Sequence, residues 1–355
     1  MGKKGLLLVF ISEYREGNEP EEYRVHGDEG AASWWIEGTQ TNDAPVKYLI
    51  SKALKDNNKI EKIICMVSEK VREKGFEQFE CMVNAYIQSS EELKTAYRGE
   101  KITFVPIGYP ESKEDISDRA AEVYKEIASA GCIGGEYGAG IYIDYTGGLR
   151  DMNFLMTGII RYLEYRGVSC EEIAYSYRDF KDKSKNRIYS LKCIYSMYQL
   201  LNGVAQFVDT GNAELLQTCY SNENDSDTKE LLEQIIRFSH AMSLCDVRDV
   251  DEIMDELCIS LDRFDSKEDK GSFFSVMFGD FTSIIREKLF IEKGRSYSYP
   301  RLIKWCLDNN MVQQALTLYI EKMPEFYCNE GILDFSEEMR EENGSGNPGQ
   351  SWRTE

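Results

Sequence analysis

The first 190 residues alternate between short apolar runs and amphipathic stretches, and this alternation limits the possible folds more than any other feature of the chain. Apolar runs typical of buried strands lie at residues 5–12, 60–68, 101–109, 140–148 and 171–180. Stretches with the 3.6-residue periodicity of helices lie between them, at residues 44–54, 70–93, 115–130 and 151–167. Continuous apolar strands that alternate with helices predict an α/β fold with a parallel sheet covered on both faces.

The pattern changes near the end of this region. Two β-like runs separated by a lysine-rich turn, at residues 171–180 and 187–191, predict a hairpin at the edge of the sheet. From about residue 191 the periodicity becomes helical and remains so. We therefore predict a parallel-sheet domain over residues 1–190, an all-α domain over residues 191–335, and a flexible tail or linker over residues 336–355.

The composition of the chain limits the range of possible functions. A formal net charge of −20 argues against broad DNA or RNA binding, which needs a basic footprint, but it permits a small anionic ligand held by a few local groups. Ten cysteines without a CxxC pair, together with two histidines, predict reduced thiols in a cytoplasmic protein without a metal site. No apolar run approaches the roughly 18 residues of a membrane span, so we expect no membrane association.

The strongest candidate site follows the fourth strand, where the sequence reads IYIDYTGGLRDMNFLM (residues 141–156). Gly147 and Gly148 can bring backbone amides close to an anionic ligand, at the start of a helix that favours negative charge. Thr146 adds a hydroxyl group, and Arg150 can bind phosphate through its planar guanidinium group. Asp144 is expected to orient the turn by accepting backbone N–H bonds. The alternative is an ordinary strand-to-helix turn with a capping threonine and a surface arginine.

Other polar and aromatic residues are predicted at the same edge of the sheet, because ligands of parallel α/β sheets bind beyond the carboxyl ends of the strands. These candidates are Ser12, Glu13, Tyr14, Thr41, Asn42, Lys47, Gly108 and Tyr109. A long loop is expected between the first strand and the helix at residues 44–54. The alternatives are that Thr41, Asn42 or Asp43 caps that helix, and that Lys47 is an ordinary exposed lysine. No GxGxxG motif follows the first strand, so the usual dinucleotide site is not expected.

These residues resemble a known family. The sequence DYTGG at 144–148 resembles the DxTHG signature of CRISPR-associated CARF-domain proteins. Residues 38–49 are similar to the segment that begins the first helix of that family, and residues 208–216 and 302–325 are similar to parts of its helical region. Together the similar segments extend over most of residues 5–325.

The resemblance implies a Rossmann-like CARF domain followed by a helical domain of winged-helix or HEPN type. It also implies a homodimer that binds a cyclic oligoadenylate, such as cyclic tetra- or hexa-adenylate, across its two-fold axis without another cofactor. Such a sensor of type III CRISPR immunity would control an effector allosterically.

The chain departs from the family in two places. Gly147 stands where the signature usually has histidine. The HEPN ribonuclease motif is also not recognisable, because Arg237 and His240 are separated by only two residues, and an amphipathic helix explains both. We predict no metal-independent ribonuclease activity. The effector is then degenerate, of another type acting on RNA or another substrate, or encoded beyond residue 355.

Two further hypotheses remain open. The first is a ring nuclease that cleaves its own cyclic ligand, for which Ser12, Thr146, Lys47 and Arg150 could position and stabilise the reacting phosphate. The second is an α/β protein outside this family that binds some other nucleotide and carries a helical interaction domain.

Overall fold

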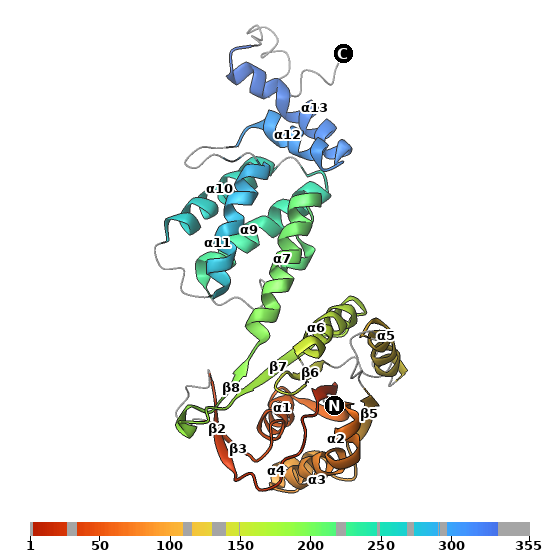
Figure 1. Cartoon of the computed structure of the whole chain (residues 1–355). Helices are drawn as coiled ribbons and strands as arrows, with labels where there is room; N and C mark the ends of the chain where they lie inside the picture. Colours follow the sequence, from red (N-terminus) through yellow and green to blue (C-terminus); the bar gives the residue numbers. More distant parts are fainter. Residues whose placement is uncertain are drawn as a thin grey trace. The chain divides into compact units, whose positions relative to one another are not determined.

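The computed structural model describes residues 3–26, 34–108, 116–129, 140–148, 150–217, 225–246, 249–267, 273–289, 291 and 297–332. The chain divides into two compact units, Met1–Lys192 and Cys193–Glu355, which Figure 1 shows in red to green and in green to blue. The first unit is an α/β structure and the second is helical, which confirms the predicted fold class.

The described part of the first unit contains one mixed sheet of eight strands. The strands are β1 (Lys3–Phe10), β2 (Glu21–Val25), β3 (Trp35–Gly38), β4 (Asn58–Val67), β5 (Thr103–Gly108), β6 (Ile141–Asp144), β7 (Cys170–Tyr177) and β8 (Arg187–Ser190). Their order is β3-β2-β8-β7-β6-β1-β4-β5, and the five strands from β7 to β5 are parallel. The predicted hairpin is present as the antiparallel pair β7–β8, but its predicted place at the edge of the sheet is wrong, because β2 and β3 lie beyond β8.

The prediction of a long loop between the first strand and the first helix is wrong. This segment contains β2 and β3, which pair with each other and extend the sheet beyond β8. Both strands alternate between buried and exposed residues, and Tyr23, Val25 and Ile36 point into the core. The outward positions of these two strands include the charged residues Glu22, Arg24 and Glu37, so the strands lack the continuous apolar run of a central strand.

The helices of the first unit are α1 (Asp43–Lys55), α2 (Glu69–Lys74), α3 (Phe76–Ile87), α4 (Glu91–Ala96), α5 (Ile116–Ile127) and α6 (Arg150–Tyr165). The single helical stretch predicted over residues 70–93 is three helices. Gly75 separates α2 from α3, and the side chain of Ser90 accepts a hydrogen bond from Leu93 N to cap α4. Gly167 follows α6 with a φ of +82°, the left-handed conformation typical of a residue that ends a helix.

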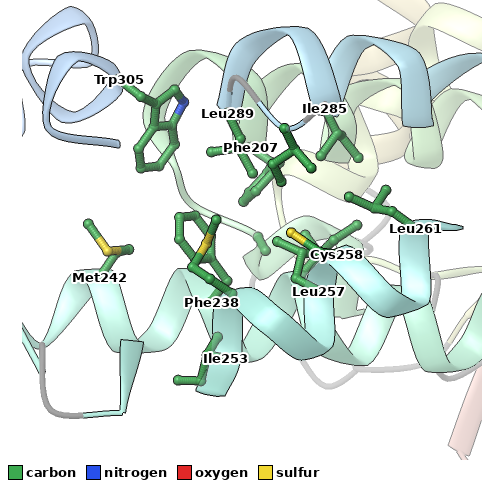
Figure 2. Close-up of a cluster of buried hydrophobic side chains, with 14 of the residues drawn as sticks. Phe207, Phe238, Met242, Ile253, Leu257, Cys258, Leu261, Ile285, Leu289 and Trp305 are labelled. Atoms are coloured by element: carbon green, nitrogen blue, oxygen red, sulfur yellow. The ribbon is translucent and has the colours of Figure 1, made fainter. Parts of the chain in front are cut away.

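The described part of the second unit includes helices α7 (Lys192–Thr210), α9 (Ser226–Ser243), α10 (Val250–Ser266), α11 (Phe273–Leu289), α12 (Tyr299–Asp308) and α13 (Val312–Asn329). Figure 2 shows their shared core, in which Trp305 lies 5.4 Å from Phe238 and 6.5 Å from Phe207 between ring centroids. Within the described ranges, no helix is both long enough and apolar enough to cross a membrane.

Candidate ligand-binding site at the strand ends

Asn42 connects three segments at the carboxyl ends of neighbouring strands. β1 and β6 run side by side, with Val9 opposite Asp144. The Asn42 side chain accepts a hydrogen bond from Ser12 N (2.8 Å) and donates to Phe10 O (2.9 Å) and to Asp144 Oδ2 (2.7 Å). Three of the predicted site residues, Ser12, Asn42 and Asp144, therefore lie together in one buried polar network.

This network replaces the helix cap that the sequence suggested. Asn42 occupies the N-cap position of α1, but its side chain makes no capping hydrogen bond. Its polar atoms are instead used by partners up to 102 residues away in the sequence. A local capping rule does not capture this arrangement, because the competing partners come from tertiary structure.

Lys47 is neither at the rim nor an ordinary exposed lysine. Its ammonium group pairs with Asp43 Oδ1 at 2.7 Å and donates to Glu37 O at 2.8 Å. Asp43 is buried and also accepts a hydrogen bond from Thr39 N at 2.8 Å. Lys47 therefore stabilises the start of α1 and is engaged within the fold.

Asp144 is fully buried and orients the turn, as the sequence predicts. Its Oδ1 accepts a hydrogen bond from Thr146 N at 2.8 Å. Burial raises the pKa of Asp144 to about 6, against the opposing effect of the hydrogen bonds from Asn42 and Thr146, which favour the charged carboxylate. Burial thus moves the pKa of this carboxyl group well above the ordinary value of an aspartate.

The two glycines of the turn have different roles. Gly147 is buried, and a Cβ atom there would lie 2.1 Å from Phe10 O, so a side chain is excluded by packing against β1. Gly148 is exposed and has a φ of +84°, which favours glycine. Thr146 Oγ1 accepts a hydrogen bond from Ser176 N at 2.8 Å and thereby ties the turn to β7. Of the two glycines, Gly148 is the one that reaches the surface.

Two recesses flank the segment Thr39–Thr41 at this edge of the sheet. The first, which we call the α3 recess, has a volume of about 370 Å³ and is lined by Ser12, Tyr14, Thr41 and Asn42 together with residues of α3. The second, which we call the β7 recess, has a volume of about 330 Å³. Its lining includes Thr41, Thr146, Arg15, Tyr175, Tyr177, Phe180, Glu21 and Arg178. Thr41 lines both recesses. One ligand that lies over the segment Thr39–Thr41 can therefore reach into both recesses.

Five of the predicted residues line these recesses, namely Ser12, Tyr14, Thr41, Asn42 and Thr146, and the others either do not line them or lie outside the described side chains. Glu13 is exposed and pairs with Lys70 at 3.7 Å. Gly108 ends β5, which β4 separates from β1. Tyr109 lies outside the described residues. Arg150 begins α6, and its side chain is likewise outside the described part of the chain.

The sequence prediction missed polar residues of the β7 recess. Arg178 binds Glu21 through two hydrogen bonds, Nε to Oε2 at 2.8 Å and Nη2 to Oε1 at 2.7 Å. These bonds from Arg178 hold the pKa of Glu21 below its ordinary value. Gln40 also binds the backbone of Arg15 in both directions. Glu21 and Arg178 are 157 residues apart in the sequence. Their proximity could have been inferred only by recognising β2, which contains Glu21, as a strand of the sheet.

Arg237 and His240, which partly resemble a ribonuclease motif, lie where a structural role explains them. Arg237 on α9 pairs with Glu256 on α10 and donates to Gln234 Oε1 at 3.1 Å. His240 is exposed at the last turn of α9. The ion pair between α9 and α10 supports the interpretation of Arg237 as part of helix packing.

The fold and its recesses define a two-part protein, with a candidate ligand-binding site at the strand ends of an α/β unit and a separate all-α unit. Residues 196–289, from α7 to α11, match a family model described as CRISPR-associated protein MJ1674, second domain. No curated protein matches the chain. Over these residues the chain is therefore similar to a CRISPR-associated protein. The match supports the predicted CRISPR association and lies outside the α/β unit.

Proposed function

We propose that this chain is a CARF-type sensor of type III CRISPR immunity that binds cyclic oligoadenylate at the strand-end recesses. The observation that carries the proposal is the pair of recesses joined by Thr39–Thr41, beside the Asp144–Gly148 turn. Two adjoining recesses of nucleoside size suit a ligand made of repeated nucleotides.

The chemistry of the lining agrees with such a ligand. Tyr14 in the α3 recess and Tyr175 and Tyr177 in the β7 recess are exposed aromatic side chains on which adenine bases can stack. Arg15 lines the β7 recess and can neutralise phosphate charge, whereas the charge of Arg178 in the same recess is paired with Glu21. No cofactor is required for binding of this kind.

A homodimer is part of the proposal. A cyclic ligand with repeated units has rotational symmetry, and two copies of the same site related by a two-fold axis match that symmetry. Binding would then change the relative placement of two helical units and so control an effector. The family match of residues 196–289 supports a CRISPR setting for the helical unit.

Isothermal titration calorimetry with cyclic tri-, tetra-, penta- and hexa-adenylate tests the proposal. We expect Tyr14→Ala to weaken binding of the preferred ring about ten-fold, because one stacked base is lost. Thr41→Val, which removes a hydroxyl group shared by both recesses, should also weaken binding. Tyr319→Ala is the matched control, since Tyr319 is an exposed tyrosine on α13.

The outcomes separate the hypotheses. Failure of the wild-type protein to bind any ring would refute the sensor function. Chromatography of the ligand after incubation distinguishes a sensor, which returns the intact ring, from a ring nuclease, which returns linear products. Sedimentation of the free and bound protein tests the dimer, and a monomer in both states would contradict the two-fold arrangement.

A further inference from the structure

Four strands at one side of the sheet carry aromatic and basic side chains on a single face. In β7 and β8, Tyr175 lies opposite Tyr189 and Tyr177 lies opposite Arg187. The same row continues into β2 and β3, where Arg24 pairs in register with Arg187 and Trp35 pairs with Arg24. We call this set the aromatic–basic face: Tyr175, Tyr177, Tyr189, Arg187, Arg24 and Trp35. Figure 1 shows the neighbouring strands from which it comes.

The register places these side chains together, because residues directly opposite one another in a sheet point to the same face. The residues between them, including Ser176, Ile188 and Val25, point to the other face and are buried. In contrast, Tyr175 is 38% exposed, Tyr177 is 42% exposed and Trp35 is 45% exposed. Large aromatic side chains at neighbouring positions of a sheet therefore remain open to solvent.

The turn between β7 and β8 adds positive charge at the end of this face. Residues 178–187 contain five lysines and arginines but two aspartates, in a chain whose formal net charge is −20. Both aspartates, Asp179 and Asp182, accept backbone hydrogen bonds within the turn. Phe180 is 82% exposed in the same turn, and the Arg178 guanidinium group lies 5.2 Å from the centre of its ring.

We propose that the aromatic–basic face binds a single-stranded polynucleotide. Unpaired bases stack on exposed aromatic rings, while arginine and lysine side chains meet the phosphates that join them. On this face, aromatic rings and cationic side chains occupy neighbouring strands. The face can therefore offer stacking contacts to bases and ionic contacts to phosphates side by side. Paired bases in a duplex do not offer their faces for stacking, and the acidic remainder of the chain disfavours the high charge density of a duplex.

The aromatic–basic face shares some residues with the proposed cyclic-ligand site, but it can be tested through residues that belong to the face alone. Tyr175 and Tyr177 also line the β7 recess, whereas Arg24 and Trp35 are not among the described residues of either recess. Arg24 and Trp35 can therefore be changed without removing a recess side chain. Tyr165 and Arg166, both exposed at the end of α6, provide matched controls.

Fluorescence anisotropy with labelled octanucleotides of single-stranded RNA, single-stranded DNA and the corresponding duplex measures the binding. We expect the full-length protein to bind the single strands in preference to the duplex, and the RNA and DNA probes identify which polynucleotide is preferred. Trp35→Ala should weaken binding about ten-fold through loss of one stacked base. Arg24→Gln should lower the slope of log affinity against log salt by about 0.7, as expected for one lost phosphate contact.

Tyr165→Ala and Arg166→Gln should bind like the wild type. Circular dichroism checks that each variant folds, and Arg24→Gln keeps the test decisive if Trp35→Ala does not fold. The proposal is overturned if neither single strand binds, if the duplex binds as tightly, or if both face variants bind like the wild type. Loss of self-association on Trp35→Ala, without polynucleotide binding by the wild type, would assign the face to a second copy and also overturn it.

Discussion

The replacement Asp144→Asn tests the electrostatics of the strand-end corner, by which we mean the polar network of Ser12, Asn42 and Asp144. Asp144 is fully buried and accepts hydrogen bonds from Asn42 Nδ2 at 2.7 Å and Thr146 N at 2.8 Å, one on each carboxylate oxygen. Asparagine has nearly the same shape but one acceptor oxygen. It therefore cannot satisfy both donors, and it does not titrate.

The size of the effect follows from the pKa of Asp144, which burial raises from 3.8 to about 6. The folded state holds this proton more tightly than the unfolded state, so the contribution of Asp144 to stability is fully present below about pH 4 and is lost as pH rises through about 6. The complete loss is about 3 kcal/mol, and about half of it occurs between pH 5 and pH 7.5, which is about 1.4 kcal/mol.

We expect the stability difference between the wild type and Asp144→Asn to move by about 1.4 kcal/mol in favour of the wild type when pH falls from about 7.5 to about 5. Urea denaturation followed by far-ultraviolet circular dichroism measures the free energy of unfolding at each pH. Other titrating groups are present in both proteins and cancel in this difference. Ser12→Ala is the matched control, because it changes the same corner without removing a titrating group.

A difference that stays constant over this pH range would refute the reasoning. It would mean that Asp144 titrates near its ordinary pKa in the folded protein and that water or another donor reaches the carboxylate. A shift of equal size in Ser12→Ala would refute it in another way, since the pH dependence would then arise from general loosening of the corner.

Four further variants test packing and charge in both units, again by denaturation. Gly147→Ala should cost about 1–3 kcal/mol because its Cβ would lie 2.1 Å from a backbone oxygen, whereas Gly158→Ala, in open space on α6, should stabilise by about 0.5–1 kcal/mol. Trp305→Ala should cost about 3–5 kcal/mol in the transition of the helical unit, and a loss below 1 kcal/mol would contradict its place in the core. Burial raises the pKa of Asp225, but hydrogen bonds from Lys267 and the first turn of α9 outweigh it and lower the pKa to about 2. Asp225→Ala should therefore lose about 2 kcal/mol above about pH 4 and progressively less as pH falls towards 2.

Periodicity predicted the central strands, the helices α1, α5 and α6, and the all-α character of the second unit, because these elements bury continuous faces whose spacing is visible in the sequence. It did not predict β2 and β3, whose alternate positions carry charge and whose pairing depends on a hairpin more than 150 residues away. The gathering of Ser12, Asn42 and Asp144 was predicted from topology, since parallel strands end at the same edge. The roles of Asn42 and Lys47 were not, because their partners are fixed by tertiary contacts.

Tertiary contacts also connect the strand-end corner to β8, the last strand of the α/β unit. Glu172 on β7 is buried and accepts hydrogen bonds from Tyr48 of α1 at 3.3 Å and from Ser190 Oγ, the last residue of β8, at 2.6 Å. Losing a donor from a buried carboxylate costs about 1–3 kcal/mol or more, so Glu172 helps to hold α1 and β8 together. α1 begins beside Asn42, and α7 begins two residues after Ser190. Through Glu172, the helix that begins beside Asn42 is therefore hydrogen-bonded to the strand that precedes α7.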